Sequence, residues 1–140
     1  FIMCRSTAGA VCIMVEGKVE ESFGPTILDW QKNASEGKQK RLKFLLSTLG
    51  LRSVDDETIR YQLLHRAVSA IITAEQFRAV AAVMLIHSFS SELAGWSDYK
   101  RFTSLFGVDA IAGSLQKLSE SSMVPLYGVW VVGNPMFLEC

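Results

Sequence analysis

A glutamate and a lysine stand two positions apart at the end of an apolar run. Residues 11–19 read VCIMVEGKV, so Glu16 and Lys18 follow five consecutive apolar residues. Side chains alternate along a β-strand, and a strand here would place Glu16 and Lys18 on the same face. Opposite charges at the end of a buried strand are costly unless they pair, bind a metal or meet an anionic ligand. The spacing indicates a candidate site, and a solvated ion pair at a strand end is the alternative.

A carboxylate beside a lysine suits the hydrolysis of phosphodiesters. If Glu16 held Mg²⁺ or Mn²⁺, the ion would polarise the phosphate and lower the pKa of a bound water. Lys18 would stabilise the charge that develops as the water attacks. The pattern therefore predicts a metal ligand in Glu16 and a catalytic role for both residues.

A second polar group follows in the segment RYQLLHR, residues 60–66. On a helix, residues three and four apart share a face, so Gln62, His65 and Arg66 would form one patch. An apolar stripe borders this patch, which indicates a cleft rather than open solvent; it consists of Ile59, Leu63 and Ala67. A hydrogen-bonded structural histidine at a helix–sheet junction is the alternative for His65.

Two further features carry weaker signals. His87 follows an apolar run, at the carboxyl edge of the predicted sheet where α/β proteins bind ligands, and a histidine bonded into the core is its alternative. A run of cations predicts either phosphate contacts or a solvated helix face; it comprises Lys38, Lys40, Arg41 and Lys43. The sequence contains no phosphate-binding glycine loop, zinc spacing or dinucleotide fingerprint.

The composition is that of one globular domain over residues 1–140. Hydrophobic residues make up 49% of the chain and charged residues 20%, which excludes a disordered chain. Fourteen basic and fourteen acidic residues give a net charge of zero. Binding to nucleic acid would therefore depend on a local basic patch.

The cysteines have neither metal-ligand spacing nor an even count. The three are Cys4, Cys12 and Cys140, and we expect Cys4 and Cys12 to be small core residues. This usage favours a reducing cytoplasm. No apolar run approaches the roughly 18 residues of a membrane span, so we expect no membrane insertion.

Periodicity predicts an α/β fold with a small mixed sheet. Strands are expected over residues 1–5, 10–19, 79–89 and 126–132, the first two as a hairpin. Helices are expected after Pro25, over 38–49, from a cap at Asp55-Asp56-Glu57 to residue 74, and over 96–106 and 109–119. The continuous apolar run within 79–89 predicts a strand that is buried on both faces, at a central position in a sheet covered by helices. The order fits a two-layer or three-layer domain.

The same segments carry a family resemblance. VEGKV with EESFGPT (15–26), RYQLLHR (60–66) and MLIHSFS (84–90) resemble a family of uncharacterised bacterial proteins over most of the chain. The hairpin that ends in Glu-x-Lys before a helix is similar to the PD-(D/E)XK nuclease-like superfamily. That resemblance implies a restriction-endonuclease-like fold and a magnesium-dependent hydrolase that acts on DNA or RNA.

The resemblance also implies roles for individual residues. Glu16 and Lys18 match the second half of the superfamily motif, and Gln62 resembles the glutamine that related nucleases carry on a later helix. His65 and Arg66 depart from the tyrosine-containing pattern and would contact substrate. Residues 1–15 contain no Asp or Glu, so the first acid of the motif is missing. Either the domain begins upstream of Phe1 and the acid lies there, or the chain is a non-catalytic interaction module that retains the fold.

Four aromatic residues could support self-association. Within residues 96–106 they are Trp96, Tyr99, Phe102 and Phe106. They predict either the contact surface of a homodimer or part of the core, and core packing is the favoured alternative.

Overall fold

The computed structural model describes residues 1–120, 124–134 and 136. Its strands are β1 (Ile2–Ser6), β2 (Gly9–Lys18), β3 (Ala81–Ser88), β4 (Gln116–Ser119) and β5 (Leu126–Val132). Its helices are α1 (Ile27–Gln31), α2 (Glu36–Thr48), α3 (Tyr61–Gln76) and α4 (Trp96–Ser104). The α/β fold with a mixed sheet and flanking helices is confirmed. None of the helices among these residues is long and apolar enough to cross a membrane.

One mixed sheet holds all five of these strands, in the order β1-β2-β3-β5-β4. The three central strands β2, β3 and β5 are parallel, and the edge strands β1 and β4 pair antiparallel with their neighbours. The predicted hairpin is β1–β2, and the predicted central strand is β3. Parallel pairing brings the carboxyl ends of β2, β3 and β5 to one edge of the sheet.

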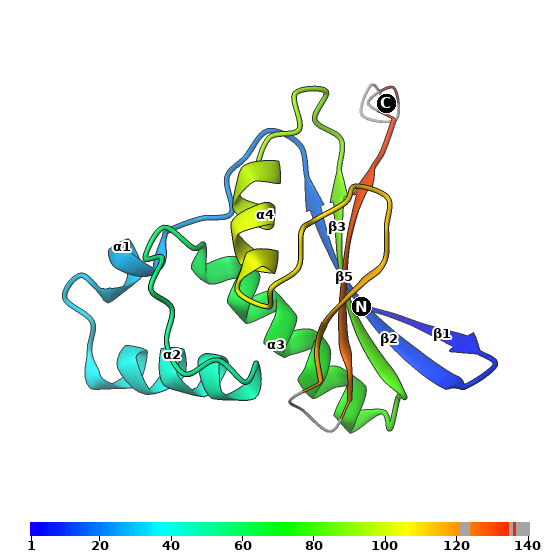
Figure 1. Cartoon of the computed structure of the whole chain (residues 1–140), viewed down its shortest axis with the longest axis horizontal. Helices are drawn as coiled ribbons and strands as arrows, with labels where there is room; N and C mark the ends of the chain where they lie inside the picture. The colour runs from blue at the N-terminus through cyan, green and yellow to red at the C-terminus, as the bar shows by residue number, and fades with distance from the viewer. Residues whose placement is uncertain (121–123, 135, 137–140) are drawn as a thin grey trace.

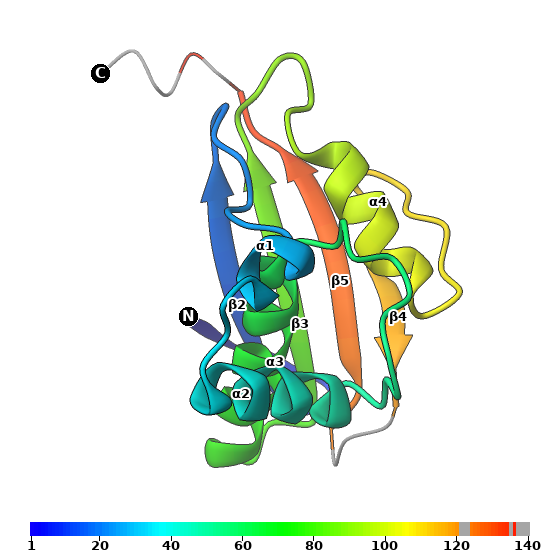
Figure 2. The same ribbon diagram turned by 90° about the vertical axis from the view of Figure 1, so that its left-hand side faces the viewer.

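All four helices lie on one face of the sheet, as Figure 1 shows with the sheet nearly edge-on and Figure 2 shows with the helices in front. The domain therefore has two layers, one of the two predicted alternatives, and the prediction that β3 is buried on both faces is wrong for part of the strand. Ala82, Met84 and Ile86 face the helices and are fully buried, whereas Leu85 and His87 on the other face are partly exposed.

The helical layer packs on the sheet mainly through α3. Its inward stripe is fully buried and includes small side chains that let the helix lie close to β2 and β3; it consists of Leu63, Ala67, Ala70 and Ala74. The helix begins at Tyr61, so the predicted cap at Asp55-Asp56-Glu57 is wrong. Asp56 instead accepts a hydrogen bond from the backbone N–H of Thr58, in a turn that precedes the helix.

Three local predictions have different outcomes in the structure. The helix predicted over 109–119 is wrong, because β4 occupies Gln116–Ser119 and supplies β5 with an antiparallel partner. Cys4 is exposed rather than buried, because β1 is an edge strand in a hairpin that extends away from the helices (Figure 1), whereas Cys12 is buried as predicted. Tyr99 and Phe102 are buried in the core, which confirms the favoured alternative for the 96–106 aromatics.

Candidate functional site

Glu16 and Lys18 lie at the carboxyl end of β2, on the face that the helices cover, because both contact Gln62 of α3. Glu16 is 8% exposed and Lys18 is 4% exposed, so the pair is buried and the solvated alternative is excluded. Their burial follows from strand alternation, because Cys12 and Met14 precede them on the same face of β2. Charges at this depth require partners, and α3 supplies them.

Four side chains form one connected group, which we call the Glu16 cluster: Glu16, Lys18, Gln62 and Arg66. Lys18 Nζ lies 3.2 Å from Glu16 Oε1, and Gln62 Nε2 donates to the same oxygen at 2.6 Å. Lys18 Nζ also donates to Gln62 Oε1 at 3.3 Å. Arg66 Nε lies 2.6 Å from Glu16 Oε2, in an ion pair whose N–H direction is not that of a hydrogen bond.

The start of α3 is held in place from two sides, which positions Gln62 and Arg66. Tyr61 N donates to Pro25 O at 3.1 Å, tying the first turn to the segment after β2. Arg60 donates through Nε to Asp98 Oδ2 at 3.0 Å and through Nη1 to Gly24 O at 2.9 Å. Because Gln62 and Arg66 are one turn apart, both reach Glu16 from the same helical face.

Lys18 has further partners that sequence reasoning missed. Its ammonium donates to Ser22 O at 3.3 Å and lies 4.8 Å from the centre of the Phe23 ring. Glu21 Oε1, on an exposed side chain, lies 4.0 Å from the same nitrogen. Hydrogen bonds from the backbone N–H groups of Glu21 and Val19 lower the pKa of Glu21, so that carboxyl is ionised near neutral pH.

The residues present do not fit a magnesium ion. Mg²⁺ requires several oxygen ligands in near-octahedral geometry. Gln62 and Lys18 occupy one oxygen of Glu16, and Arg66 faces the other. Among the described residues, no group of three or more His, Cys, Asp or Glu side chains could hold a metal ion. The metal-ligand role of Glu16 therefore stays a prediction without a supporting ligand set.

A cavity of about 270 Å³ opens beside the Glu16 cluster. It is lined by Arg41, Tyr61, Gln62, His65 and Arg66, so α2 contributes one cation and α3 the remaining groups. His65 is exposed, lines this cavity together with Gln62 and Arg66, and lines a second cavity together with Arg41. Partial burial lowers the pKa of His65, and the charges of Arg66 and Arg41 lower it further. The imidazole is therefore neutral at pH 7.

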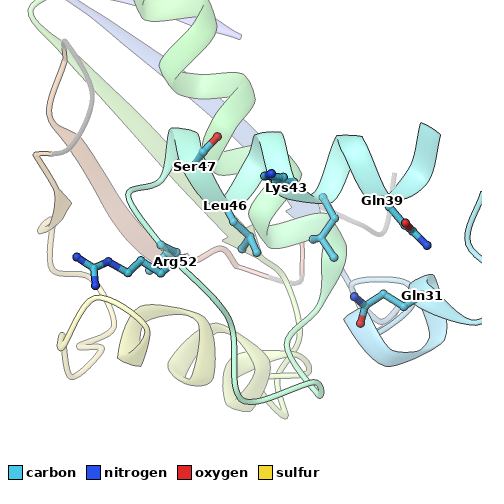
Figure 3. Close-up of a pocket in the computed structure, with 8 residues that line it drawn as sticks. Gln31, Gln39, Lys43, Leu46, Ser47 and Arg52 are labelled. Carbon is cyan, nitrogen blue, oxygen red and sulfur yellow. The ribbon is translucent and has the colours of Figure 1, made fainter. Parts of the chain in front are cut away.

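Arg41 is the only member of the predicted cation run that lines this cavity. Lys40 pairs with Glu36 on the exposed face of α2, and Lys38 lies over the Trp30 ring. Lys43 lines a larger cavity of about 590 Å³ between α2 and the segment that follows it. In Figure 3 Leu46 points into this hollow, whereas Arg52 extends away from it. This larger cavity contains no member of the Glu16 cluster and no carboxylate.

His87 is separated from the site by the sheet. It pairs in register with Gly17, so its side chain lies on the face opposite to Glu16 and Lys18. Its ring packs against Phe89 with centroids 4.3 Å apart. At the carboxyl edge of the sheet, the side chains on the face covered by helices are therefore Glu16 and Lys18, and His87 lies on the other face.

Comparison with known proteins assigns the chain to a family. Residues 1–135 match the model of a family described as a domain of unknown function (DUF6946). The chain belongs to this family. Membership agrees with the predicted resemblance to uncharacterised proteins and does not extend to the nuclease superfamily. No curated protein and no solved structure matches the chain.

Proposed function

We propose that this chain is an interaction module with a nuclease-like fold, which binds the phosphate backbone of a nucleic acid. The observation that carries the proposal is the cavity beside the Glu16 cluster, where Arg41 and Arg66 meet at an open surface. Arginine side chains bind phosphate through paired, charge-assisted hydrogen bonds. The module would hold a phosphate between these two side chains, with His65 at the rim.

The charge balance favours an anionic ligand. Three cations lie in or beside the cluster, namely Lys18, Arg41 and Arg66, and two carboxylates face them, Glu16 and Glu21. One positive charge is therefore left over in a chain whose formal net charge is zero. A local excess of this kind attracts a phosphodiester even when the whole protein is neutral.

Glu16 has a positioning role in this proposal. Its carboxylate faces Arg66 Nε, and in this proposal the two terminal nitrogens of the guanidinium would meet the ligand. Gln62 bridges Glu16 and Lys18, which keeps the carboxylate from turning towards the cavity. A fixed guanidinium loses less conformational entropy on binding than a free one.

The relationship to PD-(D/E)XK nucleases forms part of the proposal. It is supported by the Glu-x-Lys pair on the helix-facing side of a parallel strand and by Gln62 reaching both members from a later helix. Metal-dependent hydrolysis is not included, because the described residues offer no group of three or more His, Cys, Asp or Glu side chains that could hold a metal ion. The interaction module is therefore the function that the geometry supports best.

The test is a titration of labelled DNA and RNA oligonucleotides with the full chain, followed by fluorescence anisotropy. Arg66→Ala and Arg41→Ala should each weaken binding about tenfold and lower the slope of log affinity against log salt by about one. Lys43→Ala is the matched control, because it removes the same charge from α2 at the other cavity. Equal losses in all three variants, or no binding at any salt concentration, would refute the proposal.

The same samples test hydrolysis. Incubation with Mg²⁺ or Mn²⁺ should leave both oligonucleotides intact in wild-type protein and in Glu16→Gln. Cleavage by the wild type that is absent from Glu16→Gln, in samples whose circular dichroism shows that the variant is folded, would replace the interaction module with a metal-dependent nuclease.

A further inference from the structure

Two neighbouring cavities between α2 and α3 share Arg41 and His65. The first is the polar cavity of about 270 Å³ beside the Glu16 cluster. The second, of about 210 Å³, is largely apolar and is lined by Arg41, Phe44, Leu45, His65, Val68, Ser69 and Ile72. Moving along the groove from Arg66 to Ile72 therefore leads from cationic side chains to apolar ones.

The cationic cavity and the apolar cavity match the phosphate and the base of a nucleotide. A phosphate carries the charge that Arg41 and Arg66 would neutralise, and a base offers a flat, largely apolar surface only a few bonds away. In a duplex the bases are stacked inside the helix and cannot enter a side cavity, whereas an unstacked single strand can present one. Together the two cavities lie in the size range of small-molecule sites.

We propose that the apolar cavity, which we call the Phe44 cavity, receives an unstacked base of a single-stranded nucleic acid. This inference rests on the proposed function, because the phosphate next to that base would be held at Arg66. The ligand class thereby narrows from nucleic acid in general to single strands.

The aromatic residues around the shared wall support the assignment. Trp30 and Tyr61 stack with centroids 3.7 Å apart and planes 8° apart, and His65 continues the series 6.2 Å from Tyr61 at 25°. The His65 ring is thus backed by a packed aromatic pair and is itself exposed at the boundary of the two cavities. Phe44 adds a side chain that is 51% exposed despite its apolar ring. Both rings offer stacking surface for a base.

The experiment compares three labelled probes on the full chain: a thymidine single strand, an abasic strand of the same length and charge, and a duplex. The single strand should bind about tenfold more tightly than the abasic strand, and more tightly than the duplex. Phe44→Ala should remove most of this preference and leave the abasic affinity unchanged. Phe44 is on the surface, so its removal leaves the core intact.

The matched control is Phe77→Ala, which removes an equally exposed ring at the end of α3, outside both cavities. Equal binding of the base-containing and abasic strands would overturn the base site while the Arg66-dependent phosphate site stood. A preference for the base that survives Phe44→Ala, or tighter binding of the duplex, would also overturn it. Failure of every probe to bind would remove the proposed function as well.

Discussion

Replacing Glu16 with glutamine should destabilise the protein strongly, although the two side chains have nearly the same shape. Glu16→Gln leaves Lys18, whose side chain is 5% exposed, without its closest anion. Breaking a buried ion pair from one side costs about 3–5 kcal/mol. Lys18 retains the Ser22 carbonyl and the Phe23 ring, so we expect a loss of about 3 kcal/mol, at the lower end of that range.

Urea denaturation followed by circular dichroism measures this loss. For a slope of about 2 kcal/mol per molar urea, the midpoint should fall by roughly 1.5 M. The control is Glu36→Gln, which breaks the pair with Lys40 on the surface of α2, where the two side chains are 79% and 76% exposed. That change should cost about 1 kcal/mol or less.

A double-mutant cycle separates the orphaned charge from other effects. Lys18→Met removes the cation and leaves Glu16 paired with Arg66, so it should cost less than Glu16→Gln. The double variant Glu16→Gln/Lys18→Met should be more stable than Glu16→Gln alone, by about 1 kcal/mol or more. If the two losses simply add, or if Glu16→Gln costs no more than Glu36→Gln, the reasoning from burial is wrong.

Three further predictions concern other parts of the fold. The pKa of His65 is lowered from 6.5 in the folded state, so the unfolded chain binds the proton more readily and the free energy of unfolding should decrease as the pH falls below about 6.5. Urea unfolding at pH 5 to 8 measures how the free energy of unfolding depends on pH, and His65→Gln should weaken that dependence. Gly95→Ala should destabilise by about 2–4 kcal/mol in the same assay, because Gly95 has φ +84° and a Cβ there would lie 2.7 Å from Phe23 Cε2; a change below about 1 kcal/mol would contradict this. Leu63→Ala should lower the free energy of unfolding by about 2–5 kcal/mol, because Leu63 lies on the inward face of α3 and is fully buried. Leu28→Ala, at a residue that is 47% exposed, should change it by less than about 1 kcal/mol.

The sequence predicted the elements whose side chains follow one periodicity. Strand β5 lies at the predicted residues 126–132, and β2, β3, α2 and α4 lie within a few residues of their predicted bounds. The hydrophobic pattern decides these elements because burial of a single face or a continuous run is a local property of the chain. The placement of Glu16 and Lys18 on one buried face followed from the same alternation.

Errors arose where partners distant in the sequence decide the outcome. Residues 116–119 form a strand only because β5 presents an unpaired edge to them. The start of α3 lies at Tyr61 because Pro25 and Asp98 hold the chain there, so local acidic residues do not determine it. Cys4 is exposed because its hairpin lies at the edge of the sheet, which no local pattern distinguishes from a central one.

In the candidate site, too, local patterns predicted one part of the arrangement and tertiary packing decided the other. Glu-x-Lys and the spacing of Gln62 and Arg66 are visible in the sequence, and each predicts residues that share a face. Only the tertiary structure decides that the two faces meet, that Glu16 is enclosed by Lys18, Gln62 and Arg66, and that Arg41 arrives from α2 to form a cavity. The physical reason is that periodicity determines which side chains share a face of one element, whereas the packing of α3 and α2 over the sheet determines which faces come together.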